Sequence, residues 1–337
     1  MNNLKAIQAI KKKYGDLVFV AGENKDRLSI PRYSTGSLGI DIATGGGIPQ
    51  GRITLLYGDE STGKTLLSLN TIRSAQMKDK KALCGFIDAE GSFDFKWAEH
   101  LGIDLDRLVY AGSDNLEQAF DVLIAFALDG LDVIVFDSIA SSAPIGEIDG
   151  EMGDNQVALQ ARVVNKGLRK LQAALNAVAA TKKPTVIMIN QIRQKITLYG
   201  DPTTIPGGLG QRFFSSLSIR LTRGKAYPWE NDKDVLGSQD VRWKIAKSKI
   251  CAPGAQGTYQ LILAGPRMGA IDTDQEVLAF AQKYGVVEKA GAWFKFGEES
   301  VQGLANLKHR AADIEPLLYE KLKEVLGDEY KLSKMAP

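Results

Sequence analysis

The sequence predicts an α/β fold with a mostly parallel central sheet. Four short runs rich in β-branched residues carry apolar side chains on both faces: "RITLLYG", "ALCGFIDAEG", "LDVIVFDS" and "PTVIMINQ". Longer helical patterns separate these runs, for example over residues 65–77 and 116–127. Strands that are buried on both faces are typical of a parallel sheet with helices on either side. Two further strand-like runs, "SLSIRLTR" and "VRWKIAKSKI", follow without long helices between them and predict an antiparallel extension.

The same patterns divide the chain into four segments. Residues 1–33 are expected to form a helix and a linker, because apolar residues recur at helical spacing from residue 3 to 14. This helix packs either on the chain's own core or on a neighbouring subunit. Residues 34–267 are predicted to form the core. Residues 268–330, helix-rich but broken by "KAGAWFKFG", predict a small α+β domain, with a tail at 331–337.

Composition excludes several classes of protein. With 337 residues, 44% of them hydrophobic, the chain has enough apolar surface for a globular core without crosslinks. Cys84 and Cys251 are too few and too far apart for a disulfide framework or a metal cluster, which indicates a reducing, cytoplasmic setting. No run is apolar enough for a signal peptide or a membrane span. The net charge of +2 excludes a grossly basic coat protein, so any nucleic-acid site must rest on a local patch.

One segment matches a phosphate-binding pattern. Gly58–Thr65, "GDESTGKT", fits G-x-x-x-x-G-K-[ST] between a predicted strand and a predicted helix. Glycines let backbone N–H groups surround phosphate oxygens, and the helix N-terminus adds partial positive charge. Lys64 is expected to reach the β- and γ-phosphates, and the Thr65 hydroxyl to ligate Mg²⁺. The sequence therefore predicts a site for a nucleoside triphosphate with Mg²⁺.

Polar residues end three other predicted strands. Asp137 follows "VIVF", where a carboxylate can hold the water shell of Mg²⁺. Among Asp88, Glu90 and Asp94 of "FIDAEGSFD", Glu90 is the candidate that orients an attacking water. Gln191 ends "VIMINQ", where an amide can bind the γ-phosphate and report its presence to the following loop. Taken alone, a strand-end amide is more often structural.

Two glycine-bearing loops, 146–156 and 193–208, follow predicted strands and are long enough to be functional or disordered. The second contains Lys195, Ile196 and Tyr199, which suit contact with the backbone and bases of single-stranded nucleic acid. A flexible surface loop is the alternative interpretation.

Basic residues also line one face of a predicted helix that begins near Asn155. Arg162, Lys166, Arg169 and Lys170 recur there at helical spacing. A row of this kind is either a solvated face or a track for phosphates. Further along, Lys247 and Lys249 stand two apart on one side of an extended segment. They are either solvated or, if a nucleotide lies at a subunit interface, act in trans on its γ-phosphate.

Together these segments resemble the bacterial RecA recombinase family. The matching stretches occur in the family's order and spacing: "STGSLGIDIATGGGIPQGRI", "YGDESTGKT", "FIDAEGSFD", "VIVFDS", "EIDGEMGD", "INQIRQKI", "GDPTTIPGG", "KSKICAP" and "VEKAGAWF". The resemblance covers most of the chain and implies a RecA-type P-loop core with an N-terminal polymerisation helix. It implies a filament on single-stranded DNA that uses ATP and Mg²⁺, pairs with homologous double-stranded DNA and exchanges strands in DNA repair and the SOS response.

The resemblance also implies roles for individual residues. Catalysis falls to Glu90, Lys64 and Gln191. Nucleotide binding falls to Gly58, Asp59, Glu60, Ser61, Thr62, Gly63, Lys64, Thr65, Leu66, Asp94, Trp97 and Asp137, with Mg²⁺ on Thr65 and, through water, on Asp137. Contact with the neighbouring subunit falls to Phe213, Lys247 and Lys249. DNA binding falls to Arg162, Arg169, Arg193, Lys195, Ile196, Tyr199, Gly207, Gly208 and Arg212.

Two other functions fit part of the pattern. A ring helicase or a regulatory ATPase would share the P-loop core but would have no reason for the "GAWF" domain. A filament or DNA-binding regulator that binds ATP without useful turnover is disfavoured by Glu90. The chain departs from the family pattern at Trp97, where Tyr is usual, and at Gly91, where His is usual. Such departures suit a phage or mobile-element member.

Overall fold

A computed structural model describes residues 8, 10–13, 30–150, 157–178, 182–194 and 203–327. The chain falls into two compact units, Met1–Pro31 and Arg32–Pro337. In the first unit, residues 8 and 10–13 are helical, and the rest of the predicted N-terminal helix lies outside the described residues, as does the predicted tail. The division into segments at residues 33 and 267 stays a prediction.

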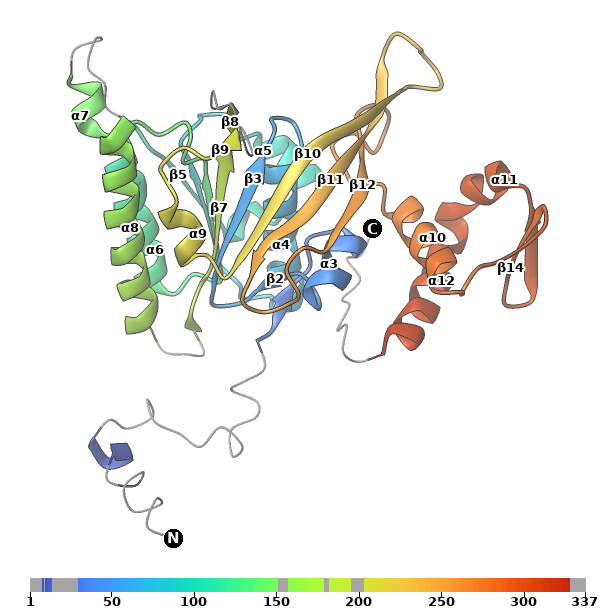
Figure 1. Ribbon diagram of the computed structural model, residues 1–337, viewed down its shortest axis with the longest axis horizontal. Coiled ribbons are helices and arrows are strands. Elements are labelled where there is room, and N and C mark those ends of the chain that lie inside the picture. Colours follow the sequence, from blue (N-terminus) through green and yellow to red (C-terminus); the bar gives the residue numbers. More distant parts are fainter. Residues whose placement is uncertain are drawn as a thin grey trace. The chain divides into compact units, whose positions relative to one another are not determined.

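An eight-stranded sheet forms the centre of the second unit (Figure 1). Its strands are β3 (Ile53–Gly58), β4 (Cys84–Asp88), β5 (Leu108–Gly112), β6 (Val133–Asp137), β7 (Thr185–Gln191), β10 (Leu217–Pro228), β11 (Leu236–Ser248) and β12 (Gln256–Ile262). The order across the sheet is β12-β11-β10-β3-β7-β6-β4-β5. The strands from β10 to β5 are parallel, whereas β11 and β12 are antiparallel to their neighbours. The predicted parallel sheet with an antiparallel extension is therefore confirmed.

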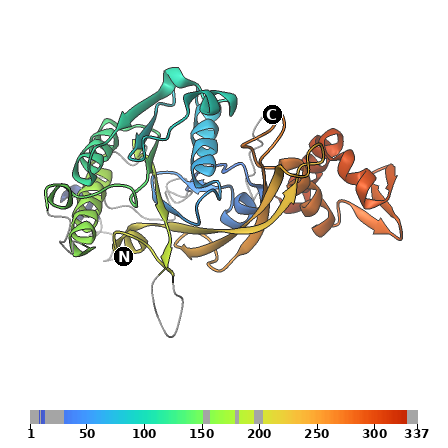
Figure 2. The same ribbon diagram turned by 90° about the horizontal axis from the view of Figure 1, so that it is seen from above.

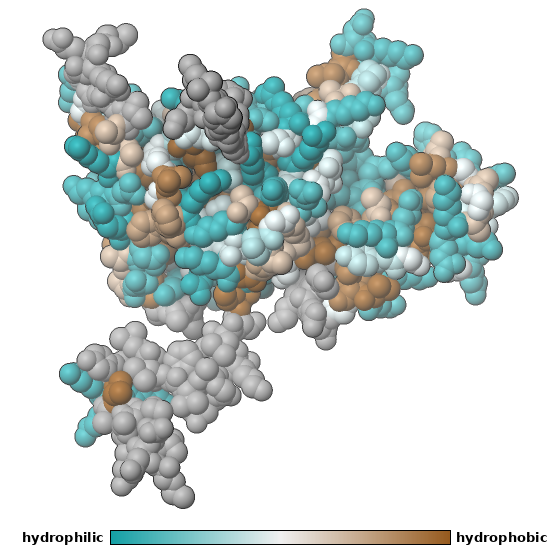
Figure 3. Space-filling model, viewed as in Figure 1, coloured by the Kyte–Doolittle hydropathy of each residue, from teal (hydrophilic) through white to brown (hydrophobic). Residues whose placement is uncertain are grey.

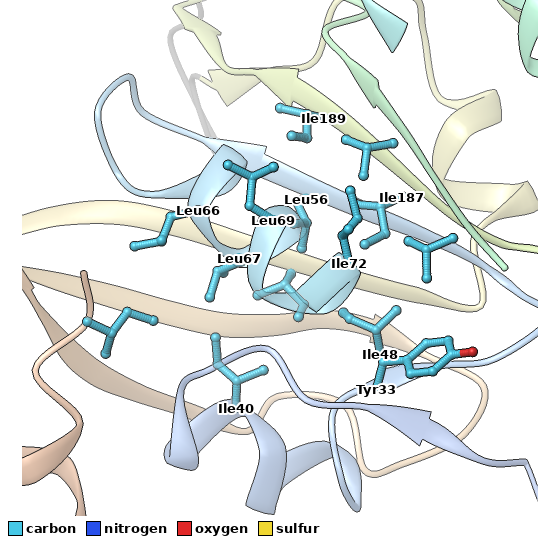
Figure 4. Close-up of a cluster of buried hydrophobic side chains, with 14 of the residues drawn as sticks. Tyr33, Ile40, Ile48, Leu56, Leu66, Leu67, Leu69, Ile72, Ile187 and Ile189 are labelled. Atoms are coloured by element: carbon cyan, nitrogen blue, oxygen red, sulfur yellow. The ribbon is translucent and has the colours of Figure 1, made fainter. Parts of the chain in front are cut away.

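Side chains alternate between two cores, one on each face of the sheet. In β3, Leu56 belongs to one core and Leu55 and Tyr57 belong to the other. Helix α4 (Lys64–Lys78) covers the first face, and helices α6 (Leu116–Asp129) and α8 (Val157–Ala177) cover the second. Figure 4 shows leucines of α4 packed with Leu56. Because each buried aliphatic side chain contributes roughly 1.5–3 kcal/mol, these two layers fix α4, and the loop before it, on the sheet.

Local signals set the ends of the helices. Asn115 precedes α6 and its side chain accepts a hydrogen bond from the N–H of Gln118, and Gly130 ends the helix in the left-handed conformation. Ser37 caps α3 (Leu38–Thr44), and Asp94 caps α5 (Phe95–His100). The remaining short elements of the core are β1 (Arg32–Tyr33), β2 (Ile48–Pro49), a 3₁₀ turn (Leu105–Arg107), α7 (Ile145–Ile148), β8 (Arg193–Gln194), β9 (Thr203–Thr204) and α9 (Gly210–Phe214).

The C-terminal elements build a third core. They are α10 (Thr273–Lys283), β13 (Glu288–Ala290), β14 (Trp293–Phe296), β15 (Glu299–Gln302), α11 (Leu304–His309) and α12 (Ala311–Leu326). The three strands form a separate antiparallel sheet, so the predicted α+β character is confirmed. Figures 1 and 2 show these elements gathered beside β12. Leu38 and Ile42 of α3 also belong to this third core, so the C-terminal elements pack on α3.

Some elements differ from the sequence expectation. Strand β5 was not anticipated, because its side chains are mostly half-buried or exposed and lack the apolar pattern of the inner strands. The loop expected over residues 146–156 begins with α7, and residues 151–156 lie outside the described part. Strands β10 and β11 extend into a projecting hairpin whose tip is hydrophilic (Figure 3). Among the described helices, none combines the length and apolarity needed to cross a bilayer.

Candidate functional site

The phosphate loop lies between β3 and α4, as the sequence predicts. Gly58 is buried at the end of β3 with a φ of 156°, and a Cβ atom there would overlap the carbonyl oxygen of Leu221. Gly63 immediately precedes α4 in the left-handed conformation, with a φ of 74°. Among the residues that the structure describes, Ser61 is the one non-glycine residue with a positive φ, which is 55°. These conformations curl residues 58–63 around the N-terminus of a 15-residue helix.

Two residues that no sequence motif singles out support this loop from β10 and β12. The backbone N–H of Arg223 in β10 donates to Asp59 Oδ2 at 3.0 Å, and its Nε donates to the carbonyl oxygen of Glu60 at 2.8 Å. The hydroxyl of Tyr259 in β12 donates to the carbonyl oxygen of Thr62 at 2.7 Å and is fully buried. No local motif marks these residues, because they approach the loop only through the sheet order.

Lys64 and Thr65 begin α4 with their polar atoms at the loop. Lys64 Nζ donates to the carbonyl oxygen of Asp59 at 2.6 Å. Burial lowers the pKa of Lys64, and the nearby carboxylates, Asp137 first, oppose that shift. The Leu66 side chain is buried in the core against the sheet, so its contribution to a nucleotide would come from the main chain.

Asp137 ends β6 and meets Thr65, as a shared magnesium site requires. Thr65 Oγ1 donates to Asp137 Oδ2 at 2.6 Å. Burial raises the pKa of Asp137 to about 6, while the Thr65 hydrogen bond lowers it and Glu90 raises it further. No group of three or more His, Cys, Asp or Glu side chains in the described residues could hold a metal alone. The hydroxyl and carboxylate therefore fit a Mg²⁺ that takes most of its ligands from phosphate and water.

Glu90 lies on a loop after β4 that Asp88 fixes. Asp88 Oδ1 accepts from the N–H groups of Glu90 and Gly91, at 3.0 and 2.8 Å, and its Oδ2 accepts from the N–H of Phe93 at 2.9 Å. Among Asp88, Glu90 and Asp94, Asp88 thus has a structural role in holding this loop, whereas Glu90 faces the candidate site.

Three donors converge on one oxygen of Glu90. Its Oε1 accepts from Ser138 Oγ at 2.7 Å, from Ser141 Oγ at 2.6 Å and from Gln191 Nε2 at 3.3 Å. The structure therefore brings Glu90 and Gln191, which the sequence predicts separately as site residues, into contact. The two serines were missed, although Ser138 directly follows Asp137 and so had to lie at the same sheet edge.

Asp94 and Trp97, predicted beside a nucleotide base, lie together at α5. Asp94 is the N-cap and accepts from the N–H of Trp97 at 3.0 Å. Trp97 is half-buried against the core, and a Cβ atom on Gly269 would overlap its indole nitrogen. Trp97 therefore stacks closely on the chain after β12.

The residues predicted to reach a neighbouring subunit cluster at the end of α9. Phe213 is 72% exposed there. Lys247 Nζ donates to the carbonyl oxygens of Arg212, Phe213 and Ser215, the last at 2.8 Å, and Lys249 Nζ approaches that of Phe213 at 3.5 Å. Burial and the nearby Lys249 lower the pKa of Lys247. The two lysines thus close the C-terminus of α9.

The predicted DNA contacts divide into described and undescribed residues. Lys195, Ile196 and Tyr199 lie outside the described residues. On α8, Arg162 and Arg169 are exposed, whereas Lys170 Nζ lies 3.8 Å from Asp121 Oδ1 of α6, so the basic row does have one acid beside it.

The second loop returns to the core beside α8. Arg193 is exposed in β8, which pairs with β9. Gly207 and Gly208 have φ values of 76° and 79°, and a Cβ atom on Gly208 would lie 3.3 Å from the Cβ of Ala161 in α8. Arg212 donates from Nη2 to the hydroxyl of Tyr57 at 2.7 Å, and its guanidinium lies over that ring. Arg212 thus ties α9 to β3.

A phosphate loop after β3, a carboxylate at the end of β6 and a second carboxylate on the loop after β4 all lie at the carboxyl edge of one parallel sheet. Together they define a P-loop ATPase. Comparison with known proteins identifies the family. Residues 2–265 match the family model described as RecA N-terminal domain. The chain is 37% identical over 330 residues to Protein RecA of Sulfurimonas denitrificans, covering 96% of this chain and 92% of that protein. It is 38% identical over 331 residues to Protein RecA of Mesomycoplasma hyopneumoniae, with coverage of 95% and 94%. It is 40% identical over 331 residues to Protein RecA of a Sulfurovum species, with coverage of 96% and 91%. The chain therefore belongs to the RecA family.

Proposed function

We propose that this protein is an ATP-dependent recombinase, which forms a filament on single-stranded DNA, pairs it with homologous double-stranded DNA and exchanges strands. The family membership supports DNA-dependent ATP hydrolysis and a place in recombination and repair. The observation that carries the proposal is the contact between Glu90 and Gln191, because it joins a hydrolytic carboxylate to the strand that leads into the second loop. Because the proposed substrate is DNA, we expect the protein to act in the cytoplasm.

ATP binding rests on residues 58–66. Backbone N–H groups of the loop and the Lys64 ammonium would surround the phosphates, and Thr65 and Asp137 would hold Mg²⁺. The ion, when bound, neutralises charge on the phosphate oxygens. Asp94 and Trp97 would lie beside the adenine base of ATP. The supports from Arg223 and Tyr259 keep the loop in shape before the nucleotide arrives, which lowers the cost of ordering it.

Hydrolysis uses Glu90 as the base that accepts a proton from the attacking water. Ser138 and Ser141 hold one carboxylate oxygen, so the other oxygen keeps a fixed direction. Gln191 then binds the γ-phosphate. The position of Gln191 thereby signals to the loop at 193–208 that the γ-phosphate is present. Lys247 and Lys249, with Phe213, reach the ATP of the neighbouring subunit in a helical filament. The basic residues of α8 and the second loop follow the DNA backbone.

The test is steady-state ATP hydrolysis with and without single-stranded DNA, for the unaltered protein and for Lys64→Ala and Glu90→Ala. We expect strong stimulation by DNA that both substitutions abolish, and strand exchange that requires ATP. Equal rates with and without DNA would contradict the proposal and favour a ring ATPase. Gln76→Met, a buried change far from the loop, serves as the control and should keep the stimulation.

A further inference from the structure

Two fully buried amide side chains form a contact that neither hydrolysis nor DNA binding uses directly. Asn190, the next-to-last residue of β7, and Gln211, in α9, are both 0% exposed. Asn190 Nδ2 donates to Gln211 Oε1 at 2.7 Å. Buried amides cost free energy unless they are hydrogen-bonded, so a matched pair at this depth holds one specific geometry.

The pair joins the two ends of the second loop. Asn190 lies where the chain leaves the sheet, and its Nδ2 also donates to the carbonyl oxygen of Pro206, on the returning end, at 2.9 Å. Gln211 Nε2 donates to the same carbonyl at 2.5 Å. The amides thus fix residue 206 against the end of β7, whatever path the intervening residues take.

The same pair touches Gln191 through the backbone. Asn190 Oδ1 accepts from the N–H of Gln191 at 2.9 Å, and the Gln191 side chain donates to Glu90. A displacement of the returning end therefore moves the amides and turns the residue that contacts Glu90.

The surroundings of the pair leave little room for independent movement. A Cβ atom on Gly207 would lie 2.8 Å from Gln211 Nε2 and 2.9 Å from a methyl group of Val164 in α8. A Cβ atom on Gly210 would overlap the Asn165 side chain of the same helix. Because cores this dense shift between discrete arrangements rather than deform, α9, the loop end and α8 move together.

We propose that Asn190 and Gln211 are positioning residues that transmit the state of the second loop to Gln191 and Glu90. The inference rests on the proposed function, since it assigns the path by which DNA stimulates hydrolysis. With DNA in place, the loop end holds the amides and the amides hold Gln191 at the γ-phosphate. Without the amide pair, DNA still binds the loop, but its binding no longer sets the direction of Gln191.

The test compares Gln211→Met with Gln76→Met in the full-length protein. Gln76 is also buried, 3% exposed, and its amide exchanges two hydrogen bonds of 2.9 Å with the backbone of Asp104. The two substitutions thus remove similar bonds at similar depth, but Gln76 lies at the far end of α4. We expect Gln211→Met to lower DNA stimulation of kcat about tenfold and to change KM for ATP less than about twofold, as loss of one or two buried hydrogen bonds implies. Gln76→Met should keep the stimulation.

A binding measurement separates coupling from damage. By linkage, the factor by which a non-hydrolysable ATP analogue tightens single-stranded DNA binding should fall in Gln211→Met as well. Asn190→Ser provides a second variant, and the double variant should lose no more than the larger single loss if the two amides act as a unit. Normal stimulation in folded Gln211→Met or Asn190→Ser would overturn the inference while leaving the recombinase proposal intact. Absence of stimulation in the unaltered protein would instead overturn the proposed function.

Discussion

The side-chain amide of Gln191 donates to Glu90 Oε1 at 3.3 Å, although the two residues are 101 positions apart. Strands β4 and β7 lie on either side of β6, so their carboxyl ends lie close together at one edge of the sheet. A carboxylate that would activate water is therefore in direct contact with the residue that would sense the γ-phosphate. The two serines on the same oxygen complete a site in which Glu90 has one defined orientation.

Glu90→Gln should abolish hydrolysis and spare binding. The amide oxygen can still accept from Ser138 and Ser141, but it cannot take a proton from water, so kcat should fall by about 10²- to 10⁴-fold. KM for ATP and ATP-dependent DNA binding should change little. Single-turnover hydrolysis and fluorescence anisotropy with labelled DNA measure the two effects. Retention of more than a tenth of kcat would mean that another group acts as base.

Gly58→Ala should damage the phosphate loop itself. The Cβ atom would overlap the carbonyl oxygen of Leu221, which also accepts the N–H of Asp59 at 3.1 Å. The strands β3 and β10 must separate to admit it, at a cost typical of overpacking, about 1–3 kcal/mol. We expect a lower melting temperature and loss of measurable ATP binding by calorimetry. Gly112→Ala, at the end of β5, where a Cβ atom meets nothing within 4 Å and the glycine is not in the left-handed conformation, is the control.

Arg162→Gln with Arg169→Gln should weaken DNA binding in a salt-dependent way. If both guanidinium groups contact phosphates, the slope of log K against log salt should fall by about 1.4 for single-stranded DNA, equally for all sequences. Lys170→Gln tests the same helix, but its ammonium lies 3.8 Å from Asp121 and should contribute less. An unchanged slope in the double variant would identify the row as a solvated face.

The sequence predicted the inner strands and the phosphate loop because their signals are local. Strands such as β6 are apolar on both faces, and the loop's glycines, lysine and threonine follow each other directly. Contacts made by the sheet order had no such signal: Arg223 and Tyr259 reach the loop from β10 and β12, and Gln211 meets Asn190 across 21 positions. Such pairs depend on the path of the chain, which residue spacing alone does not specify.

Glu276 connects the C-terminal elements to the ATPase core and gives the stability a pH dependence. This residue of α10 is 5% exposed, and its carboxylate accepts from the Ser37 hydroxyl at 2.7 Å and from the N–H groups of Leu38 and Gly39 at 2.9 and 3.0 Å. It therefore satisfies donors at the N-terminus of α3. Burial raises the pKa of Glu276 from 4.5 to about 7, and the nearby carboxylate of Asp41 adds to the increase while the three hydrogen bonds oppose it.

Because the folded pKa is raised, the stabilisation linked to the protonated form is fully present below pH 4.5 and is lost as pH rises through about 7. Glu276→Gln is neutral at every pH and serves as the reference. The unfolding free energy of the unaltered protein should thus fall relative to Glu276→Gln by about 3 kcal/mol between pH 4.5 and pH 8. Urea denaturation across this range measures the difference. Glu299→Gln, which removes an exposed ion pair with Arg310, is the control and should shift stability by less than about 1 kcal/mol at any pH. A constant difference between the unaltered protein and Glu276→Gln over this range would mean that the carboxylate is ionised in the folded state throughout, stabilised by its three donors.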